Sequence, residues 1–114
     1  MTRLRFRPSQ RILDAAAFKF VFKNARRSRD TYFTVLSAGA SQPHARLGLA
    51  VSRKTDKRAV VRNRIKRTVR ESFRTQSLPA QDFVVISQPK AASASANQLR
   101  SSLATHWQRL DKRT

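Results

Sequence analysis

Cationic side chains are the residues best suited to chemistry in this sequence, and they gather most densely in one segment. Residues 53–74 contain ten basic and two acidic residues, a local excess of +8 (10 − 2). Arginine binds phosphate through two parallel hydrogen bonds, lysine supplies a mobile point charge, and Asn63 can both donate and accept. This combination suits an RNA backbone with its bends and 2′-hydroxyls. The segment therefore predicts contact with a polyanion.

A helix is expected to position these side chains. Val61, Ile65, Val69 and Phe73 recur every four residues and predict a narrow apolar stripe. The neighbouring flank carries four basic residues at the same spacing, namely Arg62, Lys66, Arg70 and Arg74. A solvated cationic face without a partner is the alternative interpretation. It is disfavoured because like charges four residues apart destabilise a free helix.

The rest of the chain predicts a small mixed fold. The basic run at 26–30 is interpreted as a connection, and the strands on either side of the turn at 39–44 as a hairpin. The order of elements predicts a single RNA-binding domain over residues 1–114 with an α+β fold, a two-layer α/β sandwich of three helices on a small central sheet. The expected elements are a basic arm (1–10), a helix (14–24), strands at 31–38 and 47–51, the basic helix, a strand at 82–87, and a last helix with Leu99, Leu103, Trp107 and Leu110 on one face.

Composition restricts the function further. The 114 residues include 25 Lys and Arg against 6 Asp and Glu, giving a formal charge of +19, and there is no cysteine. Self-repulsion at this charge points to nucleic acid as the partner, and no obligate protein partner is evident. The acidic residues are at least 11 positions apart (82 − 71), and His44 and His106 fit isolated surface positions. No metal ligands and no catalytic residues are therefore predicted. Without an apolar run long enough to span a bilayer, a soluble, cytoplasmic protein is expected.

Three stretches of the chain carry a resemblance to a known family. They read LGLAVSRK (47–54), AVVRNRIKR (59–67) and RESFR (70–74), and their order matches along essentially the whole chain. The pattern Arg-Asn-Arg-x-x-Lys-Arg-x-x-Arg, with its upstream Gly-x-x-x-Ser-x-Lys, is highly specific. With these motifs the sequence resembles the protein component of bacterial ribonuclease P.

The resemblance implies a small basic protein that binds a large catalytic RNA, in a holoenzyme that removes the 5′ leader from precursor tRNA. The RNA would carry the active site and hold most of the Mg²⁺. The implied fold is an α/β sandwich with a left-handed strand-helix-strand crossover around the basic helix. Arg64 is equally explained as a plain solvated charge. The RNA-facing residues that the resemblance implies are Ser52, Arg53, Lys54, Arg62, Asn63, Arg64, Lys66, Arg67 and Arg70.

A cleft for the single-stranded leader is also implied, between the first helix and one face of the sheet. Phe18 and Phe22 lie one helical turn apart and can offer stacking platforms for bases, although such a pair equally fits a hydrophobic core. On the first strand, Tyr32, Thr34 and Leu36 are expected to share the cleft face. Relatives often carry an aromatic residue near Leu36, and this chain does not.

Two other classes of nucleic-acid-binding protein compete with this interpretation. A ribosomal protein or assembly factor shares the size, the charge and the lack of catalytic groups, and would show no preference for leader-bearing tRNA. A DNA-binding architectural protein would insert the basic helix into a groove. The sequence shows neither a dimer seam nor a minor-groove wedge, which argues against the second alternative.

Overall fold

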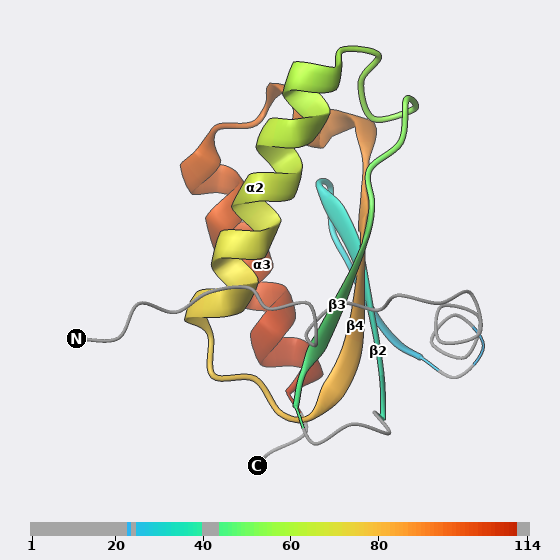
Figure 1. The fold of residues 1–114 in the computed structure, drawn as a ribbon, viewed down its shortest axis with the longest axis vertical. Coiled ribbons are helices and arrows are strands. Elements are labelled where there is room, and N and C mark those ends of the chain that lie inside the picture. Colours follow the sequence, from blue (N-terminus) through green and yellow to red (C-terminus); the bar gives the residue numbers. More distant parts are fainter. Residues whose placement is uncertain (1–22, 24, 40–43, 112–114) are drawn as a thin grey trace.

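The computed structural model describes residue 23, residues 25–39 and residues 44–111. These residues form one sheet with helices packed on one of its faces (Figure 1). The predicted α+β sandwich is confirmed. Most of the predicted first helix, with Phe18 and Phe22, lies outside the described residues, so two of the three expected α-helices are described.

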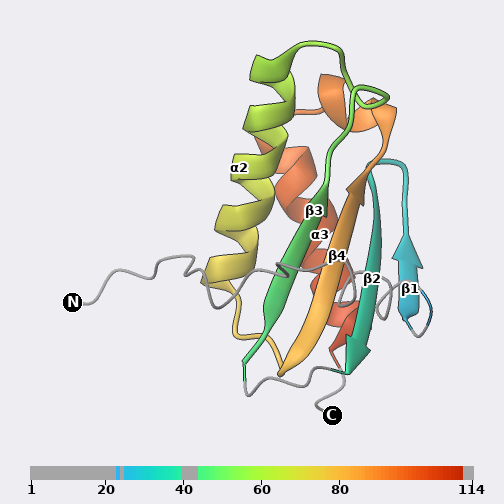
Figure 2. The ribbon, with the colours of Figure 1, turned by 45° about the vertical axis from the view of Figure 1, so that its right-hand side comes forward.

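The sheet has four strands in the order β1-β2-β4-β3 (Figure 2). β1 and β2 are antiparallel, as are β2 and β4. The strands are β1 (Arg26–Arg29), β2 (Phe33–Gly39), β3 (Arg46–Ala50) and β4 (Gln81–Ser87). The helices are α2 (Ala59–Thr75), the short 3₁₀ helix η2 (Pro89–Ser93) and α3 (Ala96–Leu110).

β1 contradicts the interpretation of residues 26–30 as a connection. The segment forms a strand because Asp30 closes a tight turn after it. The carboxylate Oδ1 of Asp30 accepts hydrogen bonds from the backbone N–H groups of Tyr32 (2.8 Å) and Phe33 (2.9 Å), and Asp30 N donates to Phe33 O (2.9 Å). At the sheet edge, charged side chains can remain in solvent. A basic sequence without an apolar pattern is therefore compatible with a strand at this position.

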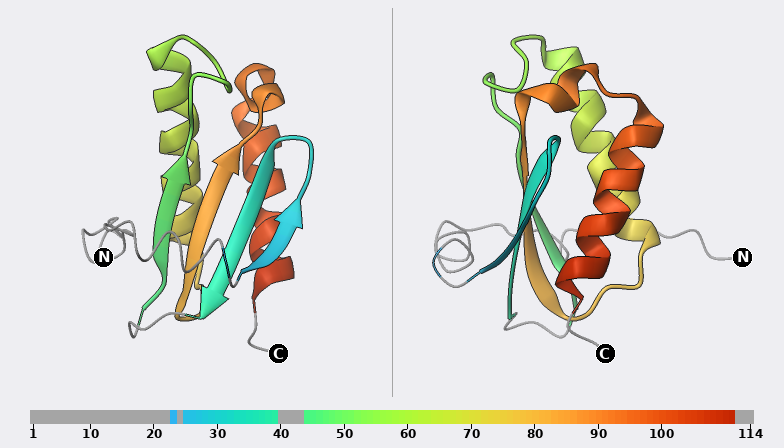
Figure 3. Two further views of the ribbon diagram at one scale, coloured as in Figure 1. Left: turned by 90° about the vertical axis from the view of Figure 1, so that its right-hand side faces the viewer. Right: turned by 180° about the vertical axis from the view of Figure 1, so that it is seen from behind.

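The expected hairpin between the second and third strands is also wrong. β4 lies between β2 and β3, and β3 pairs with β4 in parallel, from Arg46 opposite Asp82 to Ala50 opposite Ile86. Parallel neighbours need a crossover connection, which α2 supplies. In the left view of Figure 3 the helices lie behind the sheet, β3 and β4 both point upward, and β4 lies to the right of β3. The crossover is therefore left-handed, as the resemblance implied, against the usual right-handed rule.

The main hydrophobic core fills the space between the sheet and the helices. Phe73 of α2, Phe83 of β4 and Trp107 of α3 meet in T-shaped pairs with ring centroids 5.5, 6.1 and 6.3 Å apart. The apolar stripes predicted for both helices are confirmed. Their buried members are Val61, Ile65, Val69 and Phe73 on α2, and Leu99, Leu103, Trp107 and Leu110 on α3.

We call the face of the sheet that points away from α2 and α3 the second face. Leu36, Ala38 and Val84 form a separate buried apolar cluster there. Arg46 and Asp82 are paired across β3 and β4, and the arginine donates two hydrogen bonds of 2.8 and 2.6 Å to the carboxylate. This ion pair joins the two parallel strands where β3 begins.

A buried polar cluster fastens β1 and the turn after it to α3. His106 is fully buried, with Nδ1 2.6 Å from Ser28 Oγ. His106 Nε2 lies 3.2 Å from Asp30 Oδ2, an ion-pair distance without the alignment of a hydrogen bond, and Ser102 Oγ donates to the same oxygen. Burial lowers the pKa of His106, with a further contribution from Arg109, and outweighs the opposing effect of Asp30. The expectation of a surface position is wrong for His106, because its place on α3 faces the sheet.

Candidate nucleic-acid interface

The buried side of α2 determines which of its basic residues face solvent. Trp107 Nε1 donates to Ser72 Oγ (2.9 Å), and Thr68 is buried one turn earlier. α3 therefore covers the flank of α2 that carries these two residues. Asn63 and Arg67 lie on the exposed side, as the sequence predicts.

Residues of the basic segment also hold the loop that precedes α2. Thr55 is buried, and its hydroxyl donates to Ser87 O at the end of β4 (3.1 Å). Arg62 reaches back from the helix, and its Nη1 donates to Asp56 O (3.0 Å) and Lys57 O (2.8 Å). Arg62 therefore orders the backbone where the loop enters α2.

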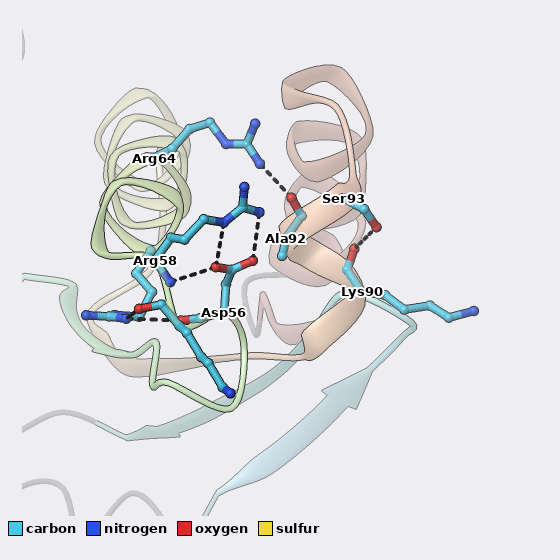
Figure 4. A network of polar contacts seen from close by, with 8 residues as sticks. Asp56, Arg58, Arg64, Lys90, Ala92 and Ser93 are labelled. Atoms are coloured by element: carbon cyan, nitrogen blue, oxygen red, sulfur yellow. Dashed lines mark hydrogen bonds and ion pairs between the residues drawn. The ribbon is translucent and has the colours of Figure 1, made fainter.

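Asp56 is neutralised by its own loop. Its carboxylate accepts hydrogen bonds from Nε and Nη2 of Arg58 (both 3.1 Å) and from the backbone N–H of Arg58 (2.8 Å), as Figure 4 shows. The side-chain hydrogen bonds from Arg58, aided by the backbone one, lower the pKa of Asp56 to about 2. The pair leaves Arg58 with an anionic partner already in place.

Arg64 links α2 to the 3₁₀ helix η2. Its Nη2 donates to Ala92 O (2.8 Å), a contact between residues 28 positions apart (Figure 4). The interpretation of Arg64 as a plain solvated charge is therefore wrong. Its guanidinium helps to fix the position of η2 against the helix that carries the basic residues.

Three other basic side chains of α2 have no polar partner among the residues that the structure describes. They belong to Lys66, Arg67 and Arg70, of which Arg67 and Arg70 are exposed. Asn63 and Arg67 line a shallow depression together with Val60, which is 74% exposed. We call Asn63, Lys66, Arg67 and Arg70 the cationic face. It presents hydrogen-bond donors and charges that the described part of the fold does not use.

The turn before α2 presents two further basic residues. Ser52 Oγ accepts a hydrogen bond from Lys54 N (3.2 Å), and Ser52 O accepts one from Thr55 N (3.0 Å). Arg53 and Lys54 are exposed on this turn. The turn lies at the same end of the molecule as the start of α2 (Figure 1). The structure thus brings the predicted loop residues close to the basic helix.

The residues predicted for the leader cleft are not all on one face. Thr34 and Leu36 lie on the second face, where Leu36 is 1% exposed within the apolar cluster and Thr34 is half-buried, with Oγ1 3.0 Å from Gln88 Nε2. Tyr32 instead packs against the main core and lines a depression along α3. The expectation that Tyr32 shares the face of Thr34 and Leu36 is therefore wrong. Tyr32 lies in the bend before β2, where strand alternation does not apply.

The described ranges contain no group of three His, Cys, Asp or Glu residues that could hold a metal ion. Over the same ranges, no helix has the length and apolar character needed to cross a membrane.

A sheet crossed by a basic helix, on which Lys66, Arg67 and Arg70 have no polar partner among the described residues, is the kind of fold and site expected of a polyanion-binding protein. Comparison with known proteins specifies the family. The family model "Ribonuclease P" matches residues 6–111. The chain is 47% identical over 104 residues to the ribonuclease P protein component of Aliivibrio fischeri, covering 90% of this chain and 89% of the relative. It is 46% identical over 110 residues to that of Methylococcus capsulatus, covering 95% and 86%.

Solved structures agree with this assignment. The Staphylococcus aureus RNase P protein at 2.0 Å superposes with a TM-score of 0.79 at 32% identity, covering 88% of this chain and 93% of that one. The Thermotoga maritima RNase P protein gives a TM-score of 0.75 at 30% identity, covering 96% and 99%. The chain belongs to the ribonuclease P protein family. It is the protein subunit of an endoribonuclease that contains an RNA subunit and acts in tRNA 5′ processing.

Proposed function

We propose that the cationic face of α2 binds the RNA subunit and neutralises closely spaced phosphates. The observation that carries this proposal is the lack of any polar partner, within the described chain, for Lys66, Arg67 and Arg70. Arg62 and Arg64, on the same helix, already donate to carbonyl oxygens of the protein. Phosphate contacts by free cationic side chains release counterions and so supply salt-dependent affinity.

The substrate contact in this proposal lies on the second face of the sheet. The single-stranded 5′ leader of precursor tRNA follows this face past Thr34, and Phe18 and Phe22 remain the predicted stacking platforms. Catalytic Mg²⁺ is held mainly by the RNA subunit. The protein lowers the Mg²⁺ concentration that the holoenzyme needs, because its own charges replace part of the cation atmosphere. Its contribution is the binding and positioning of RNA.

Cleavage of precursor tRNA by bacterial ribonuclease P RNA at low Mg²⁺, with and without this protein, tests the proposal. We expect protein-dependent cleavage at the leader junction, and tighter binding of precursor than of mature tRNA by the holoenzyme. The double variant R67A/R70A is expected to need more Mg²⁺ and to lower the salt slope of binding to the RNA subunit by roughly 0.7–0.9 per lost phosphate contact.

A matched control removes the same charge elsewhere. Lys90 on η2 and Arg100 on α3 are exposed and lie outside the cationic face, so K90A/R100A is expected to behave like the wild type. If both double variants lower the salt slope equally, total charge is responsible and the assignment to the cationic face is wrong.

A further inference from the structure

The edge strand β1 places two arginines at the margin of the second face. Arg27 lies opposite Leu36 and Arg29 opposite Thr34 in the antiparallel register. Directly opposed residues point to the same side of a sheet, so both arginines share the face of Leu36 and Thr34. Ser28, between them, points to the other side, where its hydroxyl contacts α3.

These two arginines are not used by the part of the fold that the structure describes. Arg27 and Arg29 are exposed, and within the described chain neither takes part in a hydrogen bond or an ion pair. Arg26 on the same strand lies on the helix side, and its Nη2 donates to Arg109 O (3.3 Å). The strand thus carries one arginine that contacts α3 and two that are directed to solvent.

We infer that Arg27 and Arg29 bind phosphates of the single-stranded 5′ leader of precursor tRNA. The inference rests on the proposed function, in which the leader follows the second face. Alternate residues of a strand lie about 6.6 Å apart, so the two guanidinium groups form a row along β1 that an extended backbone can follow. Each guanidinium can bind phosphate through two hydrogen bonds. Thr34 and Gln88, half-buried on the same face, offer polar groups beside Arg29.

The position of β1 favours the leader over the RNA subunit as the source of these phosphates. β1 is the edge strand at one side of the sheet, and β3 is the edge strand at the other. α2, which carries the cationic face, packs behind the β3 side, whereas α3 packs behind β1 and β2 (Figure 3). The arginines of β1 therefore form a second, separate basic surface that adjoins the proposed path of the leader.

The test compares two precursor tRNAs in the assembled holoenzyme, one with a long leader and one with a single-nucleotide leader. R27Q/R29Q is expected to bind the long-leader precursor about fivefold to tenfold more weakly, because two exposed ion pairs are lost. Its salt slope for that substrate is expected to fall by about 1.4, which is 0.7 for each single-strand phosphate contact. Binding of the single-nucleotide precursor and of mature tRNA is expected to stay at the wild-type level.

Two further variants separate the contact from charge and folding. R26Q/R100Q removes two charges from the helix side of the molecule and is expected to bind both precursors as the wild type does. R27K/R29K keeps the charge on the second face and is expected to recover most of the affinity and of the salt slope. Thermal unfolding followed by circular dichroism checks that each variant is folded before binding is measured.

Several results would overturn the inference. Equal weakening with long and short leaders would show a contact that does not involve the leader. Unchanged RNA binding together with greater self-association of R27Q/R29Q would show that the arginines only protect a sheet edge from pairing. If R27Q/R29Q binds normally while the wild type still prefers long leaders, this inference fails alone. If the wild type shows no preference for a leader, the proposed leader contact fails with it.

Discussion

Arginines that look equivalent in the basic segment have different tasks in the folded protein. Arg62 donates to two carbonyl oxygens of the preceding loop, and Arg64 donates to Ala92 O of η2. Arg67 and Arg70 are exposed and have no polar partner within the described chain. The sequence shows only a run of positive charge, because the carbonyl groups that occupy some of these side chains are placed by the tertiary structure.

This division predicts different effects for two substitutions. Arg67→Ala is expected to lower the salt slope of RNA binding by about 0.7–0.9 and to leave the stability of the free protein unchanged. Arg62→Ala removes two hydrogen bonds from a charged donor and is expected to lower the free energy of unfolding by about 1 kcal/mol. Urea unfolding and RNA binding at several salt concentrations measure both quantities. If Arg62→Ala had the stability of the wild type and lowered the salt slope as much as Arg67→Ala does, the different tasks assigned to Arg62 and Arg67 would be contradicted.

At the scale of elements, the joint between β1 and α3 is expected to be sensitive to pH. Burial lowers the pKa of His106 below its ordinary value of 6.5, so the unfolded chain binds this proton more readily than the native protein. The contribution of neutral His106 to stability is complete above about pH 6.5 and is lost as the pH falls below it, at no more than about 1.4 kcal/mol per pH unit. Asp30 and Arg109 are the charged groups that act on this imidazole.

Urea unfolding between about pH 7.5 and pH 5 measures this dependence. His106→Gln is expected to lower stability near neutral pH and to flatten the fall on acidification. A second loss of stability on acidification is expected from Asp30, because its pKa in the folded protein is lowered. Burial raises this pKa, but the hydrogen bonds from Ser102 and from the backbone lower it by more. That loss is expected as the pH falls below about 4. An unchanged slope in His106→Gln would assign the acid sensitivity to other groups.

The elements with a repeating apolar pattern are those that the sequence predicts. α2 and α3 follow from apolar residues spaced three to four apart, and β4 follows from a buried apolar run. β1 has no such pattern, because the turn at Asp30 and the edge position allow a polar strand. The insertion of β4 between β2 and β3 and the hand of the crossover depend on contacts between residues far apart in sequence. Local patterns contain no information on such contacts.

The candidate site shows the same limit. The sequence identifies the exposed side of α2, since it follows from helical periodicity alone. The face on which Tyr32 lies depends on where β2 begins. The assignment of Arg27 and Arg29 to the second face depends on the register of β1, a strand that the sequence pattern does not predict. Helical periodicity therefore identifies the exposed side of α2, whereas the burial of His106 on α3 and the faces of residues at strand ends and edges required the structure.

At the scale of the whole molecule, two separate surfaces of the described chain carry basic side chains that have no polar partner among the described residues. The cationic face lies on the β3 side, and Arg27 and Arg29 lie at the β1 edge. Neighbouring strands are about 4.8 Å apart, so the two outer strands of this sheet are separated by about 14 Å. The proposed function and the inference for β1 together therefore predict that two RNA segments contact the protein at the same time, one on each side of the sheet.

The net charge of +19 also predicts that anions stabilise the free protein. Folding brings like charges together on α2, and an anion bound between them relieves the repulsion only in the native state. Stabilisation grows with the concentration of the bound anion and reaches about 2.7 kcal/mol at about 100 times Kd. Thermal unfolding in sodium sulfate and in sodium chloride at equal ionic strength measures the effect. We expect a higher Tm in sulfate, because the divalent anion can contact two guanidinium groups at once.

The variant R67A/R70A identifies where the anion acts. We expect it to lose part of the gain in Tm that sulfate gives, and to keep the response to chloride, since screening does not depend on a particular pair of side chains. K90A/R100A is expected to keep both responses. An equal gain from sulfate in all three proteins would show that sulfate acts through exclusion from the protein surface, as it does for proteins in general. Loss of the sulfate gain only in R67A/R70A would show that the cationic face binds compact anions before any RNA is present.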